Sequence, residues 1–405
     1  MQTNIIKNLL SPELTDEADK ILRSCVHCGF CTATCPTYQI FSDELDGPRG
    51  RIYLIKQMLE GVAPSKKTLT HLDRCLTCRS CETTCPSGVK YSRLLDIGKH
   101  FAEKNISRSL TSIIARKILL NLLLSKNLFR LILTTVQSFV FLLPKSIQAT
   151  ASISKTKLTW PTKIHQRKIL LLTGCVQETL APVIDLQLAQ LLDRCGIQTI
   201  PVKGCCGALP QHMSAEDKAL ATIKHNIDQW QSYINTGTGK EIEAIIMSSS
   251  GCGVTLKEYQ TYLQYDEHYK DKAAIISNLV KDPVELLESE TVNLKQQNTT
   301  SLSFHAPCTL QHGLGVHTKV ESLLANLGYQ LNVIKDSHLC CGSAGSYSIF
   351  HPKISKQLGN NKIAALEENQ PEIIATSNIG CLTHLNSKAQ KPVKHWLTVI
   401  YENLT

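Results

Sequence analysis

Eight cysteines near the start of the chain fall into two copies of one pattern. Residues 25–37 read CVHCGFCTATCPT and residues 75–87 read CLTCRSCETTCPS, so each copy follows C-x-x-C-x-x-C-x-x-x-C-P. Three cysteines spaced three positions apart in a short loop can place three sulfurs on one polynuclear cluster, while the fourth points elsewhere. Zinc sites are the alternative, but they use pairs of cysteines separated by longer intervals. The double motif therefore predicts two [4Fe–4S] clusters.

Each cluster is expected to take three cysteines from its own loop and one from the other loop, as in two-cluster ferredoxins. We assign the first cluster to Cys25, Cys28, Cys31 and Cys85. We assign the second cluster to Cys75, Cys78, Cys81 and Cys35. This crossing would hold the two clusters close enough for electrons to pass between them.

Composition indicates a globular protein with metal-binding thiols rather than disulfides. The chain has 405 residues, of which 42% are hydrophobic, and this length predicts two or three domains. Its seventeen cysteines are tightly clustered, and the N-terminal sequence MQTNIIKNLL lacks the pattern of an export signal. We therefore expect a reducing, cytoplasmic environment, in which clustered thiols serve as metal ligands.

The second half of the chain contains an internal duplication. Buried strands that lead toward cysteines are expected at 167–175, 197–207 and 243–252, and their counterparts at 301–308, 329–342 and 372–381. A helical segment follows each of the first two strands in both copies. Alternation of strands and helices predicts parallel sheets flanked by helices, with ligands collecting at the carboxyl ends of the strands.

The predicted fold class is α/β with an α+β N-terminal part. A helical two-[4Fe–4S] ferredoxin-like domain is expected at 1–100, and a basic helical segment with a linker at 101–166. Two duplicated β-α-β-α-β cysteine-rich domains are then expected at 167–295 and 296–405.

The repeated cysteines at the strand ends form two further candidate metal sites. The candidate third site is Cys175, Cys205, Cys206 and Cys252, and the candidate fourth site is Cys308, Cys340, Cys341 and Cys381. Buried cysteines can also be small core side chains, which is the interpretation adopted for Cys195. Repetition at equivalent strand ends favours ligation for the other eight. His212, His305, His312, His338 and His384 lie nearby in sequence, where they could be ligands or proton donors, although a structural role is the simpler expectation.

The segment 101–170 carries most of the positive charge. It has twelve Lys and Arg residues against one acidic residue, Glu103, whereas the whole chain has a net charge of +9. Its longest uncharged run, Leu131 to Pro144, is shorter than the ~20 residues of a spanning helix. Two interpretations stay open: helices that pack on a neighbouring domain or subunit, or a peripheral membrane contact through 101–145. No recognition motif accompanies this charge, so no nucleic-acid partner is expected.

Several longer stretches resemble one family. CVHCGFCTATCPTYQI, DELDGPRGRIYLIKQ, HLDRCLTCRSCETTCPSGV, PCTLQHG and DSHLCCGSAGSY together extend over nearly the whole chain. They resemble the iron–sulfur subunits of bacterial glycolate oxidase, which is a glycolate dehydrogenase. Related proteins with CCG cysteine repeats include subunits of heterodisulfide reductase, anaerobic glycerol-3-phosphate dehydrogenase and lactate-utilisation complexes.

The resemblance implies an electron-transfer subunit with no catalytic residue of its own. Partner FAD-binding subunits would oxidise glycolate or another 2-hydroxy acid, and this chain would pass the electrons to a quinone or another membrane acceptor. We accordingly expect a cytoplasmic protein held peripherally on the cytoplasmic face of the inner membrane. The sequence itself contains neither a G-x-G-x-x-G fingerprint nor a P-loop, so substrate chemistry is expected on a partner.

One departure from the fuller CCG pattern bears on whether the repeats bind iron–sulfur clusters. That pattern ends in C-x-x-C, whereas this chain has Thr255 and His384 at the last position. Additional iron–sulfur clusters in the repeats therefore stay an open expectation. The alternatives are catalysis at the repeats, such as disulfide reduction in a heterodisulfide-reductase-like complex, and a non-enzymatic binding module with structural clusters.

Overall fold

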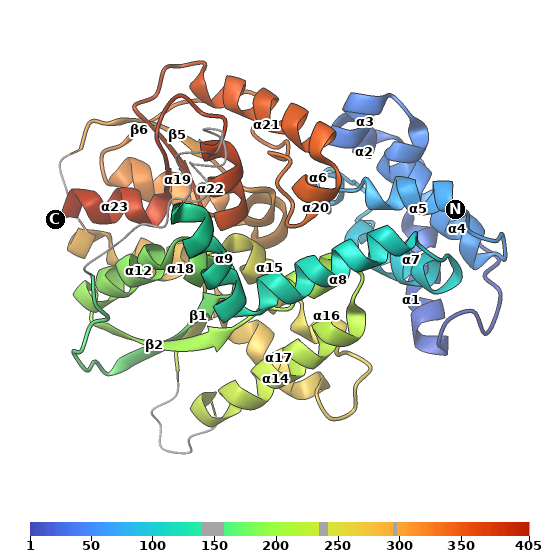
Figure 1. Cartoon of the computed structure of the whole chain (residues 1–405), viewed down its shortest axis with the longest axis horizontal. Helices are drawn as coiled ribbons and strands as arrows, with labels where there is room; N and C mark the ends of the chain where they lie inside the picture. Colours follow the sequence, from blue (N-terminus) through green and yellow to red (C-terminus); the bar gives the residue numbers. More distant parts are fainter. Residues whose placement is uncertain (139–157, 235–241, 295–297, 405) are drawn as a thin grey trace. The chain divides into compact units, whose positions relative to one another are not determined.

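The computed structural model describes residues 1–138, 158–234, 242–294 and 298–404 (Figure 1). The chain divides into two compact units. The first comprises Met1–Lys117 and His338–Leu358, and the second comprises Ile118–Ser337 and Gly359–Thr405. The segment that carries Cys340 and Cys341 thus groups with the N-terminal residues.

Every regular element that the structure describes in residues 1–117 is a helix, as expected for the two-cluster domain. These elements are α1 (Pro12–Ser24), α2 (Phe30–Ala33), α3 (Pro36–Phe41), η1 (Glu44–Asp46), α4 (Pro48–Leu59), α5 (Lys66–Asp73), α6 (Ser80–Thr83), α7 (Tyr91–Asn105) and the start of α8 (Leu110–Leu124). The later segment of this unit adds α20 (Tyr347–Phe350) and the start of α21 (Pro352–Glu367).

Local sequence signals set the helix ends near the first cysteine loop. The Ser11 side chain accepts a hydrogen bond from the Leu14 N–H at 3.3 Å, and Pro12 occupies the first helical position of α1. Helix α4 ends at Leu59, shortly before Gly61, whose φ is +97°. These local signals account for the start of α1 and the end of α4.

Helices α1, α4 and α7 enclose the core of the first unit. Leu22, Ile55 and Leu94 contribute fully buried side chains to this core. Gly98 of α7 lets α7 and α4 approach closely, because a Cβ atom there would lie 2.5 Å from Ile55 Cγ1. The packed core fixes the helix ends from which both cysteine loops begin.

Two four-stranded parallel sheets form the framework of the second unit. The first sheet has the order β2-β1-β3-β4 and contains β1 (Arg167–Gly174), β2 (Ile197–Gly204), β3 (Ala244–Ile246) and β4 (Val280–Lys281). Its helical elements are α11 (Gln177–Leu180), α12 (Pro182–Arg194), α13 (Ala208–His212), α14 (Glu216–Ile234), α15 (Ser250–Lys257), α16 (Tyr259–Tyr262), α17 (Lys270–Leu279), α18 (Pro283–Leu287) and η3 (Glu288–Leu294).

The second sheet repeats the topology of the first. Its order is β6-β5-β7-β8, with β5 (Ser301–His305), β6 (Gln330–Leu331), β7 (Ile373–Thr376) and β8 (Val393–His395). Its helical elements are η4 (Thr309–Leu314), α19 (His317–Asn326), the remainder of α21, α22 (Ile379–Asn386) and α23 (Trp396–Leu404). The predicted duplication is confirmed, and each copy has a fourth strand beyond the three expected. Strand β6 is shorter than the 329–342 segment predicted for it.

Strand β1 is buried on both faces, as a central parallel strand requires. Ile169 and Leu171 face the core shared with α12, whereas Leu170 and Leu172 face the core that includes α14 and α17. Because β1, β2 and β3 run parallel, the residues that follow them emerge at one edge of the sheet.

The described part of the basic segment contains the end of α7, all of α8, and α9 (Lys126–Ser138). Among the described residues, no single helix is long and apolar enough to cross a membrane. Helix α8 and Asn127–Thr135 of α9 would together reach that length and composition, but the chain bends by 96° between them. The expected linker lies largely in 139–157, outside the described residues.

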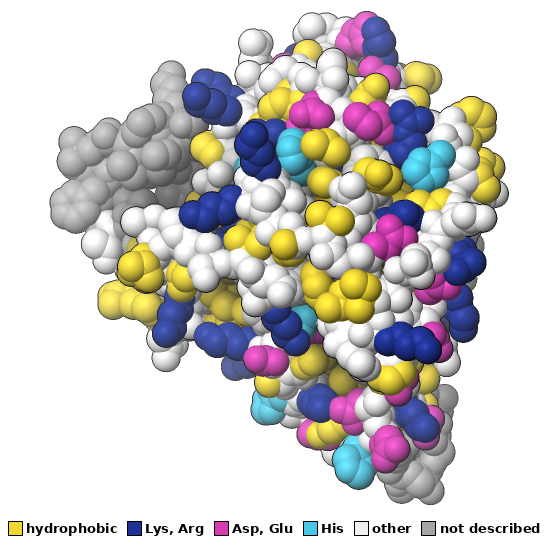
Figure 2. All heavy atoms as spheres, turned by 90° about the vertical axis from the view of Figure 1, so that its right-hand side faces the viewer, with side chains coloured by type: hydrophobic (Ala, Val, Ile, Leu, Met, Phe, Trp, Pro, Cys, Tyr) yellow, Lys and Arg dark blue, Asp and Glu magenta, His cyan; other side chains and the backbone are white. Residues whose placement is uncertain are grey.

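Charge is mixed on the face shown in Figure 2, which is the right-hand side of Figure 1. Lys and Arg side chains alternate there with Asp and Glu side chains, and hydrophobic side chains are scattered among them. This mixture agrees with a chain whose excess positive charge is concentrated in one segment.

Gly98→Ala should destabilise the first unit, although Gly→Ala within a helix normally stabilises it by ~1 kcal/mol. The added methyl would overlap Ile55, and we expect a net loss of about 1–3 kcal/mol in the free energy of unfolding. Chemical denaturation of anaerobically purified protein measures this change. Ile55→Ala in the same chain should cancel part of the Gly98→Ala penalty. Additive effects of the two substitutions would contradict the close approach.

Candidate metal centres

The two N-terminal cysteine loops share one backbone conformation. The angle φ is positive at His27 (+57°) and Gly29 (+85°), and again at the equivalent Thr77 (+51°) and Arg79 (+62°). These left-handed turns fold each loop back toward its first cysteine, and the Thr77 N–H lies 3.4 Å from Cys75 Sγ. Arg79 adopts a conformation that costs a side-chain-bearing residue about 1–2 kcal/mol, so the loop geometry is imposed by the surrounding structure.

Each loop contributes a cysteine to the cavity of the other loop. The cysteines of the predicted first set that line one cavity are Cys25, Cys28, Cys31 and Cys85. Those that line the other cavity are Cys35, Cys75, Cys78 and Cys81, and Cys81 also borders the first. The structure therefore brings together both sets of thiols assigned from the sequence. Their coordination of clusters stays a prediction.

The donor set in these cavities fits a polynuclear iron cluster. Burial raises the pKa of the Cys31 thiol to about 11, with further contributions from Cys25 and Cys28. Burial likewise raises the pKa of Cys81, with Cys78 and Cys75 as the next causes. Such a group of buried thiols ionises readily only when a strongly positive centre neutralises it. Soft thiolates gathered four to a cavity are the ligands of [4Fe–4S] clusters.

The four cysteines of the first repeat converge at the carboxyl edge of its sheet. Cys175 follows β1, Cys205 and Cys206 follow β2, and Cys252 lies in the first turn of α15 after β3. The pKa values of these thiols depend on one another: Cys175 and Cys206 act on Cys205, and Cys252 acts on Cys206. The candidate third site is thus a group of four neighbouring thiols within one unit.

Among these four cysteines, Cys205 is the one whose surroundings most favour the thiolate. Hydrogen bonds from the thiols of Cys175 and Cys206 lower its pKa, and the backbone N–H groups of Gly207 and Leu209 add to this effect. The Gly207 N–H lies 3.4 Å from the sulfur. The pKa values of Cys175 and Cys206 are raised instead, because each thiol interacts with Cys205 and is also buried.

Two buried polar side chains position the Cys205–Cys206 peptide. Asn226 Nδ2 donates to the Cys205 carbonyl at 2.7 Å and to the Tyr259 hydroxyl at 2.8 Å. The Tyr259 hydroxyl in turn donates to the Cys206 carbonyl at 3.0 Å. These residues lie on α14 and α16, far from the cysteines in sequence, and the spacing of the motif gave no sign of them.

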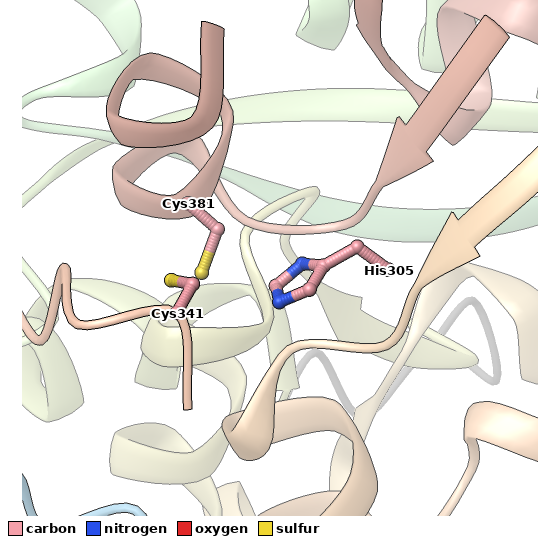
Figure 3. A group of neighbouring side chains, drawn as sticks. All are labelled: His305, Cys341 and Cys381. Atoms are coloured by element: carbon pink, nitrogen blue, oxygen red, sulfur yellow. The ribbon is translucent and has the colours of Figure 1, made fainter. Parts of the chain in front are cut away.

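The candidate fourth site is divided between the two units. Cys308 and Cys381 belong to the second unit, and Cys340 and Cys341 belong to the first. Within the second unit, a ring nitrogen of His305 and the sulfur of Cys381 lie within 4.8 Å of each other, at the end of β5 and in the first turn of α22 (Figure 3). Ligation of one metal by all four cysteines stays a prediction.

The histidines near the second repeat have structural partners. His305 Nδ1 lies 3.0 Å from Thr376 Oγ1, and burial lowers the pKa of His305 to about 3, so the ring is neutral. His384 Nδ1 lies 3.4 Å from Lys388 Nζ. Cys195 is part of the apolar core, as predicted.

Tyr259→Phe should lower the free energy of unfolding by about 1–3 kcal/mol, because it leaves the Cys206 carbonyl without its donor in a buried site. Tyr262→Phe is the matched control on the same helix, since its hydroxyl contacts Glu258 at 3.5 Å in a partly buried site. Chemical denaturation of both variants gives the comparison. Equal losses in the two variants would show that the Asn226–Tyr259 contacts do not support the cysteine pair.

Comparisons with known proteins agree with this arrangement. Residues 21–89 match the family described as "4Fe-4S dicluster domain", and residues 169–257 and 302–386 each match the family described as "Cysteine-rich domain". These matches confirm the predicted fold class and the presence of a domain for two [4Fe–4S] clusters.

Several relatives are similar over long stretches. The chain is 47% identical to the glycolate oxidase iron–sulfur subunit of Escherichia coli (strain K12), over 100% of this chain and 99% of that protein. It is 27% identical to a probable glycolate oxidase iron–sulfur subunit of Bacillus subtilis (strain 168), over 92% and 90%. Lactate utilization protein A of Geobacillus sp. (strain WCH70) is 26% identical over 56% of this chain and 95% of its own length. With two four-thiol cavities, a duplicated cysteine-rich domain and this full-length similarity, the chain belongs to the family of glycolate oxidase iron–sulfur subunits and is an iron–sulfur electron-transfer subunit.

Proposed function

We propose that this chain transfers electrons within a multisubunit, flavin-dependent glycolate or 2-hydroxy-acid dehydrogenase. The observation that supports this function most directly is the pair of adjacent four-thiol cavities, each completed by a cysteine from the other loop. Two cofactors held by crossing ligands must lie side by side, and short separation is what electron transfer requires. The full-length similarity to a glycolate oxidase subunit supports the choice of complex.

The proposed division of labour places substrate oxidation on partner FAD-binding subunits. A 2-hydroxy acid gives up two electrons, and a flavin can release them singly to [4Fe–4S] clusters, which carry one electron at a time when bound. Glycolate would become glyoxylate on the partner, and a quinone or another membrane acceptor would receive the electrons. The residues of this chain hold and insulate the clusters, and none is proposed to be catalytic.

We also propose that the first repeat holds a further metal centre. Its four cysteines lie at one edge of the sheet, and the neighbouring thiols of Cys175 and Cys206, with two backbone N–H groups, lower the pKa of Cys205. An additional iron–sulfur cluster is one occupant that these thiols suit. A corresponding centre in the second repeat is proposed only from the equivalent cysteines.

The second candidate function is that of a CCG-repeat subunit in a lactate-utilisation, heterodisulfide-reductase-like or anaerobic glycerol-3-phosphate dehydrogenase complex. The similarity to lactate utilization protein A favours the lactate version, but it extends over only 56% of this chain. Thr255 and His384 stand where the fuller CCG pattern has a fifth cysteine. The glycolate-linked function is therefore preferred.

We further propose a cytoplasmic location with peripheral attachment to the cytoplasmic face of the inner membrane. Exposed aliphatic side chains on α8 and α9 support this, among them Ile118 (62% exposed) and Leu131 (63% exposed). Lys117 and Arg130 are exposed cations on the same helices. Arg116 is excluded from such a role, because it is ion-paired with Asp73 at 3.5 Å. Residues 139–145 of the expected contact lie outside the described residues.

Paired cysteine substitutions test the crossing ligands. Cys28→Ser and Cys85→Ser should each remove one cluster, which is about four irons per chain. Because both residues are assigned to the first cluster, the Cys28→Ser/Cys85→Ser chain should lose no more iron than either single variant. Cys28→Ser/Cys35→Ser should lose about eight irons, and metal that remains would report on the first repeat.

Anaerobic iron and sulfide analysis, with dye-linked glycolate oxidation by the assembled complex, gives the readout. All the variants should transfer electrons poorly while the partner keeps its flavin. Additive loss of iron in the Cys28→Ser/Cys85→Ser chain would show that the ligands do not cross.

Neutralising Lys117 and Arg130 should weaken binding of the complex to anionic vesicles by about 1 kcal/mol per charge. Lys353→Gln removes an exposed cation from α21 and is the control. Co-sedimentation at low and high salt measures the effect. If the double variant co-sediments as the unaltered complex does, α8 and α9 serve instead to pack against a partner subunit.

A further inference from the structure

Helix α4 presents two arginines to the two cysteine cavities. Arg49 lines the first cavity, and its side chain is 36% exposed and bonded to Glu44 at 2.6 Å. Arg51 lines the second cavity, and its side chain is only 1% exposed. Both guanidiniums are always charged. That of Arg51 is sealed into the wall of the second cavity, whereas that of Arg49 is open to water at the first.

Hydrogen bonds fix the Arg51 guanidinium in place. Its Nε donates to the His71 carbonyl at 2.7 Å, and its Nη2 donates to Thr37 Oγ1 at 3.1 Å. Thr37 Oγ1 lies 3.3 Å from Cys35 Sγ, the crossing cysteine of the second set. The arginine is therefore connected through one hydroxyl to a predicted ligand of the second cluster.

The carboxylate that faces Arg51 is shared with a second guanidinium. The fully buried Asp46 carboxylate lies 3.6 Å from Arg51 Nη2 and 2.7 Å from Arg74 Nη1. At the first cavity, Arg49 and Glu44 form a one-to-one pair. Arg51 lines the second cavity and Asp46 does not, so the wall of this cavity contributes a buried cation without its acidic partner.

Groups of both signs lie near the second cavity. Arg79 lines it as well. Glu82 follows Cys81 on α6, and its carboxylate, which accepts hydrogen bonds from the backbone and side chain of Ser92, keeps a negative charge that opposes the arginines. The Asp43 carboxylate, within 4.8 Å of that of Asp46, opposes them from outside the cavity lining. The Tyr91 hydroxyl donates to Cys75 Sγ at 3.5 Å, which acts in the same direction as a positive charge.

Positive charge beside an iron–sulfur cluster stabilises its reduced, more negative state and raises its reduction potential. Burial preserves this effect, because water and salt screen a buried charge much less than an exposed one. Exposure of Cys28 to water also raises the reduction potential of the first centre, but water screens the interactions there.

We propose that Arg51, which lines the second cavity while its partner Asp46 does not, makes the centre of Cys75, Cys78, Cys81 and Cys35 the stronger electron acceptor of the pair. This inference rests on the ligand assignment made above. One electron leaves the first centre, which is oxidised, and arrives at the second, which is reduced, while no bond is formed or broken. Arg51 is a positioning residue in this step: it sets the direction of electron flow without touching substrate.

The test uses a Cys28→Ser chain, in which the remaining ferredoxin-type signal belongs to the second centre. Potentiometric titration followed by electron paramagnetic resonance (EPR) measures its reduction potential. Arg51→Met should lower that potential, and Arg51→Lys, which keeps the charge, should lower it less. Asp46→Asn should raise it, because the carboxylate that offsets the arginines is lost. Arg49→Gln, two residues away on α4, should leave it unchanged.

Arg74→Gln is a second test that keeps the proposal open to contradiction if the substitutions of buried residues cause misfolding. Its side chain is 29% exposed, and its loss should also lower the potential of the second centre. Opposite shifts for Arg51→Met and Asp46→Asn would support the proposal. A full signal at an unshifted potential in both variants would overturn it. Absence of any cluster signal in Cys28→Ser alone would overturn the ligand assignment first, and the proposal with it.

Discussion

The exchange of one cysteine between two loops is the constraint on which the rest of the N-terminal domain depends. Cys85 must reach the cavity of the first loop and Cys35 that of the second, so the loops have to lie against each other. The packed helices α1, α5 and α7 meet this requirement, because the first loop begins after α1 and the second loop lies between α5 and α7. A chain that folds in this way cannot hold one cluster far from the other.

The two cavities are alike in thiols and unlike in charge. Equivalent left-handed turns give both loops the same shape, which follows from the repeated spacing. Their surroundings come from different parts of the fold, since only the second cavity has a buried arginine with a shared carboxylate. Repetition thus builds two similar sites, and the asymmetric surroundings distinguish them. A pair of centres with unequal potentials is what a directional electron path needs.

Sequence reasoning succeeded where the signal was local. The spacing of the cysteines predicted the two groups of thiols that line the cavities, and the alternation of apolar segments predicted strands such as β1 and β5. It missed β4 and β8, which are two and three residues long and, unlike the equally short β3 and β6, do not lead toward a cysteine. It also missed the inward turn of Arg51, since the groups that hold it, Asp46 and the His71 carbonyl, are brought together only by tertiary packing.

The central claim is that two crossing sets of ligands hold two clusters side by side in this chain. The most direct measurement is the EPR spectrum of the anaerobic, fully reduced protein compared with that of Cys28→Ser. The account predicts a spectrum broadened by magnetic coupling between two reduced centres, which becomes a single uncoupled signal in the variant. Two independent, unsplit signals in the unaltered protein, or bound zinc with no signal at all, would contradict it.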